Sequence, residues 1–323
     1  YEMTSSLVGS EMCIRDRGLT LMNFNYIGLQ RNNAKGYFTT DSAAGGSALA
    51  TGERHANRHI STSEEGQPYP SLSDHFREKG LPVGVVTLGN VADATPAAFY
   101  GHSVERDNAD ELTRCLMDGR IDLLCGSGIR EFTRRKDGID LVGELEKQYD
   151  FVRSVDGIDA AKGKVICIDE AMDDAAEEAN LTLLADATRA SIAKLQERGG
   201  EGFFLMVEGA KIDYAGHSRC LPGSVIETLS FDLAVAEALK FADTNGETLV
   251  IVTADHGMAA LSPKRYINLM PLLDTTQVIR TVPGTPLGLE VKEEYADTAL
   301  RILRRTGHMK AWRREQMPRR FHY

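Results

Sequence analysis

The sequence lacks the patterns that define several common protein classes. Its five cysteines are scattered and form no C-x-x-C pair, so neither a disulfide framework nor a zinc finger is predicted. No apolar run reaches the roughly 18 residues that a membrane-spanning helix needs. Acidic residues outnumber basic ones, and the net charge of −10 argues against nucleic acid as the main partner. What remains is a globular chain whose 323 residues suit one large α/β domain.

No signal peptide is predicted from the first residues given, because no basic segment precedes an apolar one there. The stretch TSSLVGSEMCIRDRG (4–18) has neither a helical nor a strand period and resembles a translated sequencing adapter. We therefore expect residues 1–18 to be a non-native scar and exclude them from the fold prediction.

The remaining chain alternates between apolar, β-branched runs and amphipathic segments, which predicts βαβ units and a mainly parallel sheet covered on both faces. Strands are expected at 82–88, 120–126, 202–209 and 247–257, and helices at 71–80, 183–200 and 222–246. Residues 130–182 are charged and irregular, so we expect a peripheral excursion there. Ligand groups of such sheets lie just beyond the carboxyl ends of the strands.

The segment TDSAAGGSALATG (40–52) predicts a helix that begins near Ser42 and consists mostly of small residues. Gly45 and Gly46 each cost about 1 kcal/mol in a helix interior, so the close approach of another element should offset them. Ser42 is either a plain helix cap or a group that meets an anion at the helix N-terminus.

Two further segments carry residues that bind metal ions. In VEGAKIDYAGH, Asp213 and His217 would share one face of a helical turn, which suits a divalent cation, although an ordinary surface pair has the same spacing. In TADH, Asp255 and His256 follow an apolar strand, where an unpaired buried charge is costly. An exposed turn is the alternative for this pair.

The segment DATPAAFYGHSVER (93–106) combines a turn with a guanidinium. Pro96 disfavours a helical conformation at Thr95. Arg106 can take two oxygens of a phosphate at once, although an isolated arginine is more often part of a surface ion pair.

Taken together and in this order, TDSAAGGSALATG, DATPAAFYGHSVER, VEGAKIDYAGH and TLVIVTADH resemble the motifs of the alkaline phosphatase family. The resemblance implies a three-layer αβα fold with a mainly parallel central sheet. It also implies hydrolysis of small phosphate monoesters through a phosphoserine intermediate at a site with two Zn²⁺ ions and one Mg²⁺ ion. Bound cations would then turn an acidic site into one that attracts anions.

The resemblance implies a role for each matching residue. Ser42 is the nucleophile and Arg106 clamps the phosphate. Asp255 and His256, with Ser42, hold one zinc ion, and Asp213 and His217 hold the other. Thr95 and Glu208 are ligands of the magnesium ion. Asp41, Asp93 and His102 are expected to contact these ligands without binding a metal ion themselves. Tyr214 has no assigned role.

Three departures from the family pattern are visible. No strand ending in a bridging aspartate precedes Ser42, so we expect the first strand to be missing. The family's late zinc-binding histidine has no clear match, because only His308 and His322 follow His256. Residues 257–323 resemble the nucleotide pyrophosphatase/phosphodiesterase family instead, which predicts an incomplete catalytic core at 19–256 joined to a C-terminal segment from a relative.

These departures leave two other functions open. The chain could be a catalytically impaired fragment, or it could act on nucleotides and phosphodiesters. The resemblance also implies a periplasmic or extracellular location and a homodimer, with no nucleic acid partner and no membrane span.

Overall fold

The fold is described from a computed structural model, which describes residues 18–37, 39–174, 176, 180–258, 267–282, 288–307 and 309–316. The expected non-native scar, apart from Gly18, lies outside the described residues, and so do His308 and His322.

Helices and strands alternate along most of the described chain. The helices are α2 (Ser42–Thr51), α3 (Leu72–Glu78), α4 (Ala94–Ala98), α5 (Ala109–Arg114), α6 (Arg130–Thr133), α7 (Leu141–Leu145), α8 (Leu183–Arg198), α9 (Lys211–His217), α10 (Leu221–Asn245) and α11 (Ala296–Arg305). The strands are β1 (Val83–Asn90), β2 (Leu123–Ser127), β3 (Tyr149–Val152), β4 (Lys164–Ile168), β5 (Phe204–Glu208), β6 (Val278–Val282) and β7 (Gly288–Val291).

The central sheet has five strands in the order β3-β4-β2-β1-β5, and all its pairings are parallel. The expected parallel α/β architecture is therefore confirmed. β1 lies inside the sheet between β2 and β5, and β5 forms an edge. Because the chain moves from β1 to one side and returns to the other with β5, the order of the strands reverses next to β1. Ligands of open parallel sheets bind outside the carboxyl ends at such a point.

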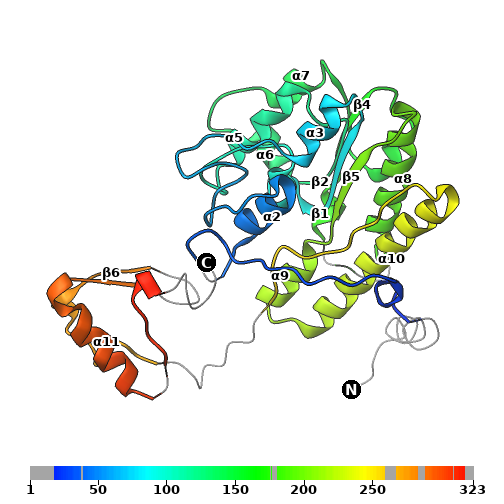
Figure 1. The fold of residues 1–323 in the computed structure, drawn as a ribbon. Coiled ribbons are helices and arrows are strands. Elements are labelled where there is room, and N and C mark those ends of the chain that lie inside the picture. The colour runs from blue at the N-terminus through cyan, green and yellow to red at the C-terminus, as the bar shows by residue number, and fades with distance from the viewer. Residues whose placement is uncertain are drawn as a thin grey trace.

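Helices cover both faces of this sheet (Figure 1). Alternate residues of a strand point to opposite faces, and the two apolar clusters divide accordingly. Leu124 of β2 belongs to the cluster with α4, α5, α6 and α7, whereas its neighbours Leu123 and Cys125 belong to the cluster with α8 and α10. The sequence runs of these strands are continuously apolar because both faces are buried. The architecture is three-layered, as expected.

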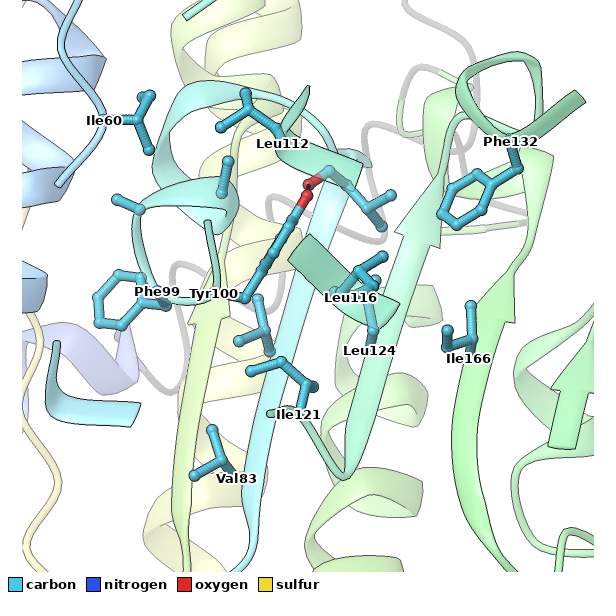
Figure 2. Packing of buried hydrophobic residues seen from close by; sticks show 14 of the residues in the cluster. Ile60, Val83, Phe99, Tyr100, Leu112, Leu116, Ile121, Leu124, Phe132 and Ile166 are labelled. Atoms are coloured by element: carbon cyan, nitrogen blue, oxygen red, sulfur yellow. Dashed lines mark hydrogen bonds between the residues drawn. The ribbon is translucent and has the colours of Figure 1, made fainter. Parts of the chain in front are cut away.

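Figure 2 shows the first of these clusters, which packs between the sheet and the helices on the α5 side. Leu124, Ile166 and Phe132 are at most 1% exposed. Tyr100 is also buried, and its hydroxyl donates to the carbonyl oxygen of Val91 at 2.7 Å. This contact ties the loop after β1 to the core and so fixes the residues that follow the strand.

The interpretation of residues 130–182 as a peripheral excursion is wrong. This segment supplies β3 and β4, and β4 lies inside the sheet between β3 and β2. The apolar run Val165–Ile168 is fully buried, but it is only four residues long and stands among charged residues. Such a short run carries too little periodicity to be recognised from the sequence.

The strand expected at 247–257 is absent from the structure. Residues 247–258 have no strand pairing, and Leu249 and Ile251 are 83% and 73% exposed. β5, the edge strand on the β1 side, has no second neighbour within the described residues. The local sequence favours an extended conformation, but an extended segment becomes a strand only through hydrogen bonds to another strand, and residues 247–258 make no such pairing with the described strands.

Leu249→Ala distinguishes the observed arrangement from the expected one, and Leu124→Ala is the reference for a side chain buried in the sheet. We expect Leu124→Ala to lower the free energy of unfolding by about 2–5 kcal/mol, because the side chain is fully buried. Leu249→Ala should change it by no more than about 0.5 kcal/mol, because the side chain is exposed. Urea unfolding measures both values. A loss of several kcal/mol for Leu249→Ala would show that residues 247–257 are packed in the sheet after all.

The antiparallel pair β6–β7 and α11 form a small third cluster, drawn apart from the sheet in Figure 1. Leu273, Ala299 and Leu303 are its buried residues. Among the described residues no helix combines the length and the apolar character that crossing a bilayer requires.

Candidate active site

Three of the predicted site residues lie at the carboxyl end of the sheet, where the strand order reverses. Asp93 and Thr95 follow β1, and Glu208 is the last residue of β5. Thr87 of β1 pairs with Glu208 in the parallel register, so the ends of the two strands lie side by side. This is the position that the topology favours for ligands.

Ser42 is the first residue of α2, but it is not the helix cap. Asp41 caps the helix, and its Oδ1 accepts a hydrogen bond from the Ala44 amide at 2.9 Å. The Ser42 hydroxyl is therefore not needed for capping. It stands at the N-terminal end of a ten-residue helix, where backbone dipoles favour an anion.

The two glycines of α2 lie where other parts of the site come close. A Cβ atom on Gly45 would lie 2.7 Å from the backbone oxygen of Asp255. A Cβ atom on Gly46 would lie 3.1 Å from Cα of Thr95. The expectation that another element approaches these glycines is confirmed, and the approaching elements carry predicted site residues themselves.

Ser42 and His256 meet although 214 residues separate them in the sequence. Ser42 Oγ lies 3.0 Å from Nε2 of His256, and Oδ2 of Asp255 lies 3.3 Å from the same nitrogen. In a Ser-His-Asp triad the carboxylate instead holds the other ring nitrogen, which orients the base. Here Nδ1 of His256 lies 3.2 Å from the carbonyl oxygen of Gly257. The arrangement is therefore not that of a triad.

The same geometry suits a cation. The Gly257 carbonyl can only accept, so Nδ1 of His256 donates to it, and in that tautomer Nε2 presents its lone pair to the Ser42 hydroxyl and to the Asp255 carboxylate. Two acceptors that face each other are stabilised by a positive charge between them. Donor atoms around a tetrahedral zinc ion with bonds of ~2.0 Å lie about 3.3 Å apart. The two distances from Nε2 of His256, 3.0 Å to Oγ of Ser42 and 3.3 Å to Oδ2 of Asp255, are close to this spacing.

Arg106 lies next to Ser42 through Asp41. Its Nη1 lies 3.4 Å from Oδ2 of Asp41, which also accepts a hydrogen bond from the Arg58 amide at 2.9 Å. The guanidinium of Arg58 is held by Glu105 at 2.9 Å. No motif in the sequence points to Arg58, and its positive φ of 72° is visible only in the structure.

Thr95 lies inside a helix, contrary to the expectation from Pro96. Both residues belong to the first turn of α4, where the amide that proline lacks would have no helical partner. Glu208 lies nearby, and Thr87 donates a hydrogen bond to its Oε2 at 2.6 Å. Burial raises the pKa of Glu208 to about 7, and hydrogen bonds from Thr87 and Thr95 offset only part of this effect.

The raised pKa of Glu208 predicts a pH dependence of stability in metal-free protein. The folded state binds the carboxyl proton more tightly than the unfolded chain, whose pKa is near 4.5. The stabilisation is therefore fully present below pH 4.5 and is lost as the pH rises through 7, by at most about 3 kcal/mol because Glu208 keeps some exposure. In a chelating buffer, the melting temperature of the wild-type protein should fall more between pH 5 and pH 8 than that of Glu208→Gln. Equal falls would contradict this.

Asp213 and His217 lie one turn apart on α9, with Oδ2 and Nε2 3.4 Å apart. This spacing also suits a shared metal ion, but the pair supplies two ligands, whereas catalytic zinc sites use three from the protein. Within the described residues, no three His, Cys, Asp or Glu side chains gather closely enough to hold a metal ion. The residues thus fit one zinc ion with the help of Ser42 and fall short of a complete second site.

The remaining two predicted positions have different surroundings. Burial raises the pKa of Asp93 to about 6, and Arg106 counteracts this. Nδ1 of His102 lies 3.0 Å from the carbonyl oxygen of Ser61, and its Nε2 lies 3.5 Å from Nη1 of Arg120. Within the described residues, these contacts do not link His102 to the other predicted site residues.

Two residues that the sequence left without a role lie against the site. The hydroxyl of Tyr214 donates to the carboxylate of Asp93, and Lys211 lies over the Tyr214 ring. Both belong to the motif that carries Asp213 and His217. The signal for both is Lys211 itself, which follows an apolar strand in the sequence. A lysine that becomes buried needs polar or charged partners, so it indicates further contacts nearby.

Comparisons with known proteins agree with this geometry. A family model described as alkaline phosphatase matches residues 8–277. Alkaline phosphatase 4 of Bacillus subtilis is 34% identical over 234 residues, which cover 68% of this chain and 50% of that protein. Streptomycin-6-phosphate phosphatase of Streptomyces griseus is 33% identical and is covered to 62% by the match, which takes in 69% of this chain. The chain thus spans between half and two thirds of these relatives.

Solved structures show the same similarity. The alkaline phosphatase of the Antarctic bacterium TAB5 superposes with a TM-score of 0.71 at 27% identity, over 79% of this chain and 76% of that chain. A variant of the TAB5 protein with Mg bound in its M3 site matches with the same TM-score at 28% identity, over 78% of this chain and 74% of that chain.

Proposed function

Since the chain belongs to the alkaline phosphatase family, we propose that it hydrolyses phosphate monoesters, with Ser42 as the nucleophile and a phosphoserine intermediate. The observation that carries this proposal is the 3.0 Å contact between Ser42 Oγ and Nε2 of His256. It joins the start of α2 to the Asp-His pair from a distant part of the sequence. A serine with only a structural role at a helix start would not need to contact a histidine and an aspartate from a distant segment.

The residues around Ser42 fit phosphoryl transfer. A phosphoryl group attacked by Ser42 would lie at the N-terminal end of α2, where the helix dipole stabilises negative charge. Arg106, held 3.4 Å from Asp41, can take two of its oxygens. Phosphoryl transfer depends mainly on positioning and on positive charge, since the transition state spreads charge over its equatorial oxygens. Ser42 attacks phosphorus, the alcohol leaves on the opposite side, and water then releases phosphate from Ser42.

The proposed metal ligands are those of the family resemblance. Ser42, Asp255 and His256 would hold one Zn²⁺ ion, Asp213 and His217 would contribute to a second, and Thr95 and Glu208 would contribute to a Mg²⁺ site. Bound metal ions would lower the pKa of the serine hydroxyl and neutralise the charge of the transferred group. The periplasmic or extracellular location, the homodimer and the boundaries at residues 18 and 256 stay predictions.

The test is release of phosphate from a chromogenic monoester by the full chain in excess Zn²⁺ and Mg²⁺, with a chelator as the negative arm. We expect turnover that the chelator abolishes, and a diester analogue that is hydrolysed more slowly. No turnover with either substrate would reject the proposal and favour an impaired fragment. Faster turnover of the diester would favour the phosphodiesterase alternative.

A further inference from the structure

Arg58 stands beside the site in a backbone conformation that favours glycine. Its φ of 72° lies in the left-handed region, where a residue with a Cβ atom is disfavoured by steric repulsion. In the described part of the chain, the other non-glycine residues with positive φ are Ser61 and Arg219. A residue keeps such a conformation where the surrounding contacts hold it there. The hydrogen bonds of Arg58 lead to groups around Arg106.

The backbone of this turn holds the aspartate that contacts Arg106. The amide of Arg58 donates to Oδ2 of Asp41 at 2.9 Å, and Nη1 of Arg106 lies 3.4 Å from the same oxygen. The side chain of Asn57 accepts a hydrogen bond from the Asp41 amide at 3.0 Å. Two neighbouring residues of the turn therefore fix both the main chain and the carboxylate of Asp41.

The guanidinium of Arg58 binds the two carboxylates that flank Arg106 in the sequence. Its Nε and Nη2 lie 2.9 Å and 2.5 Å from the two oxygens of Glu105, which makes a bidentate pair. Nη2 also donates to the carboxylate of Asp107. A single exposed ion pair contributes little, but bidentate pairs within a network of charges are the exception. Arg58 therefore occupies both acidic neighbours of Arg106 at once.

The two segments also lie side by side along their backbones. Ile60 and Ser103 form an antiparallel bridge, with the Ile60 amide donating to the Ser103 carbonyl at 2.8 Å and the Ser103 amide donating back at 3.1 Å. The bridge sets the turn that carries Arg58 against the segment that carries Arg106. The side-chain contacts of Arg58 are therefore supported by main-chain pairing close by.

Without Arg58, these carboxylates would be free to bind Arg106. Hydrogen bonds from Arg58 lower the pKa of Glu105, and the charge of Arg106 acts in the same direction, so the two side chains are close enough to attract. Within the described residues, Arg106 nevertheless forms its ion pair with Asp41. A guanidinium that binds a neighbouring carboxylate has fewer donors left for the oxygens of a phosphate.

We propose that Arg58 is a positioning residue for Arg106: its guanidinium binds Glu105 and Asp107 and so keeps both carboxylates from the phosphate-binding guanidinium, while its amide holds Asp41. This role gives a reason for an arginine at a position whose backbone favours glycine. The inference rests on the proposed function, because it assumes that Arg106 binds the phosphate. Arg58 acts through Arg106 and is assigned no contact with the phosphate.

The affinity for inorganic phosphate, measured by calorimetry on protein loaded with Zn²⁺ and Mg²⁺, tests the consequence. We expect Arg58→Gly to raise the dissociation constant about tenfold, because two freed carboxylates compete with phosphate for Arg106. Its melting temperature should stay near that of the wild-type protein, since glycine suits the positive φ. Arg58→Asn is the second variant if Arg58→Gly does not fold, because asparagine also tolerates this conformation. Arg189→Ala is the control, because it removes an exposed arginine paired with Asp186 on α8.

A rescue experiment separates this role from a merely structural one. In the Arg58→Gly background, Glu105→Gln and Asp107→Asn together remove the competing charges, and we expect the dissociation constant to return to the wild-type value. The same two substitutions in the wild-type protein should change it little, because Arg58 already binds both carboxylates there. An equal gain of affinity in both backgrounds would indicate a general effect of charge and would overturn the inference.

The remaining outcomes also decide the question. An unchanged dissociation constant in both Arg58 variants, or one that the two added substitutions do not restore, would overturn the inference, as would a wild-type protein that binds no phosphate. A protein that shows the expected pattern of affinities but hydrolyses no ester would contradict the proposed function and leave the inference standing. An active enzyme whose phosphate affinity ignores Arg58 would do the reverse.

Discussion

Ser42→Ala should lower the rate of phosphate release from a monoester by at least about a thousandfold, because it removes the atom that attacks phosphorus. The fold should be unaffected. The helix cap is Asp41, whose Oδ1 still accepts from the Ala44 amide, so the variant loses a hydroxyl and no structural contact other than that with His256. Steady-state kinetics and thermal unfolding measured on the same preparation separate the two effects.

Ser63→Ala is the control for this prediction. The Ser63 hydroxyl also contacts a titratable side chain, Glu65 at 2.9 Å, but it lies in a turn outside the site. We expect its activity to equal that of the wild-type protein. A Ser42→Ala variant that retained wild-type turnover would show that another group attacks the phosphate.

Gly45→Ala should lower activity by about a hundredfold or more while the helix remains formed. Helix propensity alone predicts the opposite direction for stability, since alanine is favoured over glycine by about 1 kcal/mol. The new Cβ atom, however, would lie 2.7 Å from the backbone oxygen of Asp255 and 3.1 Å from its Cβ atom. Atoms do not approach so closely, so Asp255 must shift and carry His256 with it. A displacement of about 1 Å is enough to cost a hundredfold in rate.

Gly200→Ala is the matched control for this substitution. Nothing lies within 4 Å of the Cβ atom that it would add, and the residue is exposed. We expect unchanged activity and, in circular dichroism, unchanged helix content for both variants. Full activity of Gly45→Ala would mean that the segment at Asp255 is not seated against α2.

Local signals in the sequence predicted three of the five strands of the central sheet and the helices α2, α3, α8 and α10. α10 begins at Leu221 with Pro222 in its first turn and ends before Gly246, whose φ of 68° suits glycine. α3 ends before Gly80 in the same way, with φ of 73°. β1, β2 and β5 are recognisable because apolar, β-branched runs are bounded by polar or glycine residues.

Features that depend on distant partners were not predictable. β4 is too short to stand out among charged residues, and its identity as a strand comes from pairing with β2 and β3. Residues 247–257 show the reverse: the sequence favours a strand, but the segment pairs with none of the described strands, and β5 remains the edge of the sheet. β structure depends on pairing more than helices do.

The candidate site shows the same division. The meeting of Ser42 with Asp255 and His256 was expected from the family resemblance, although the strand predicted to carry Asp255 and His256 does not form. Tyr214 and Lys211 were missed because their partners, Asp93 and Asp173, come from other segments of the chain. The residue types alone do not reveal such contacts.

The proposed function requires that Ser42 becomes covalently phosphorylated in a site shared with Asp255 and His256. The most direct measurement is mass spectrometry of the protein quenched in acid during turnover of a monoester, followed by proteolysis. We predict the added mass of one phosphoryl group on Ser42, and its absence in Ser42→Ala. Turnover without any modified serine, or a phosphoryl group at another residue, would contradict the account.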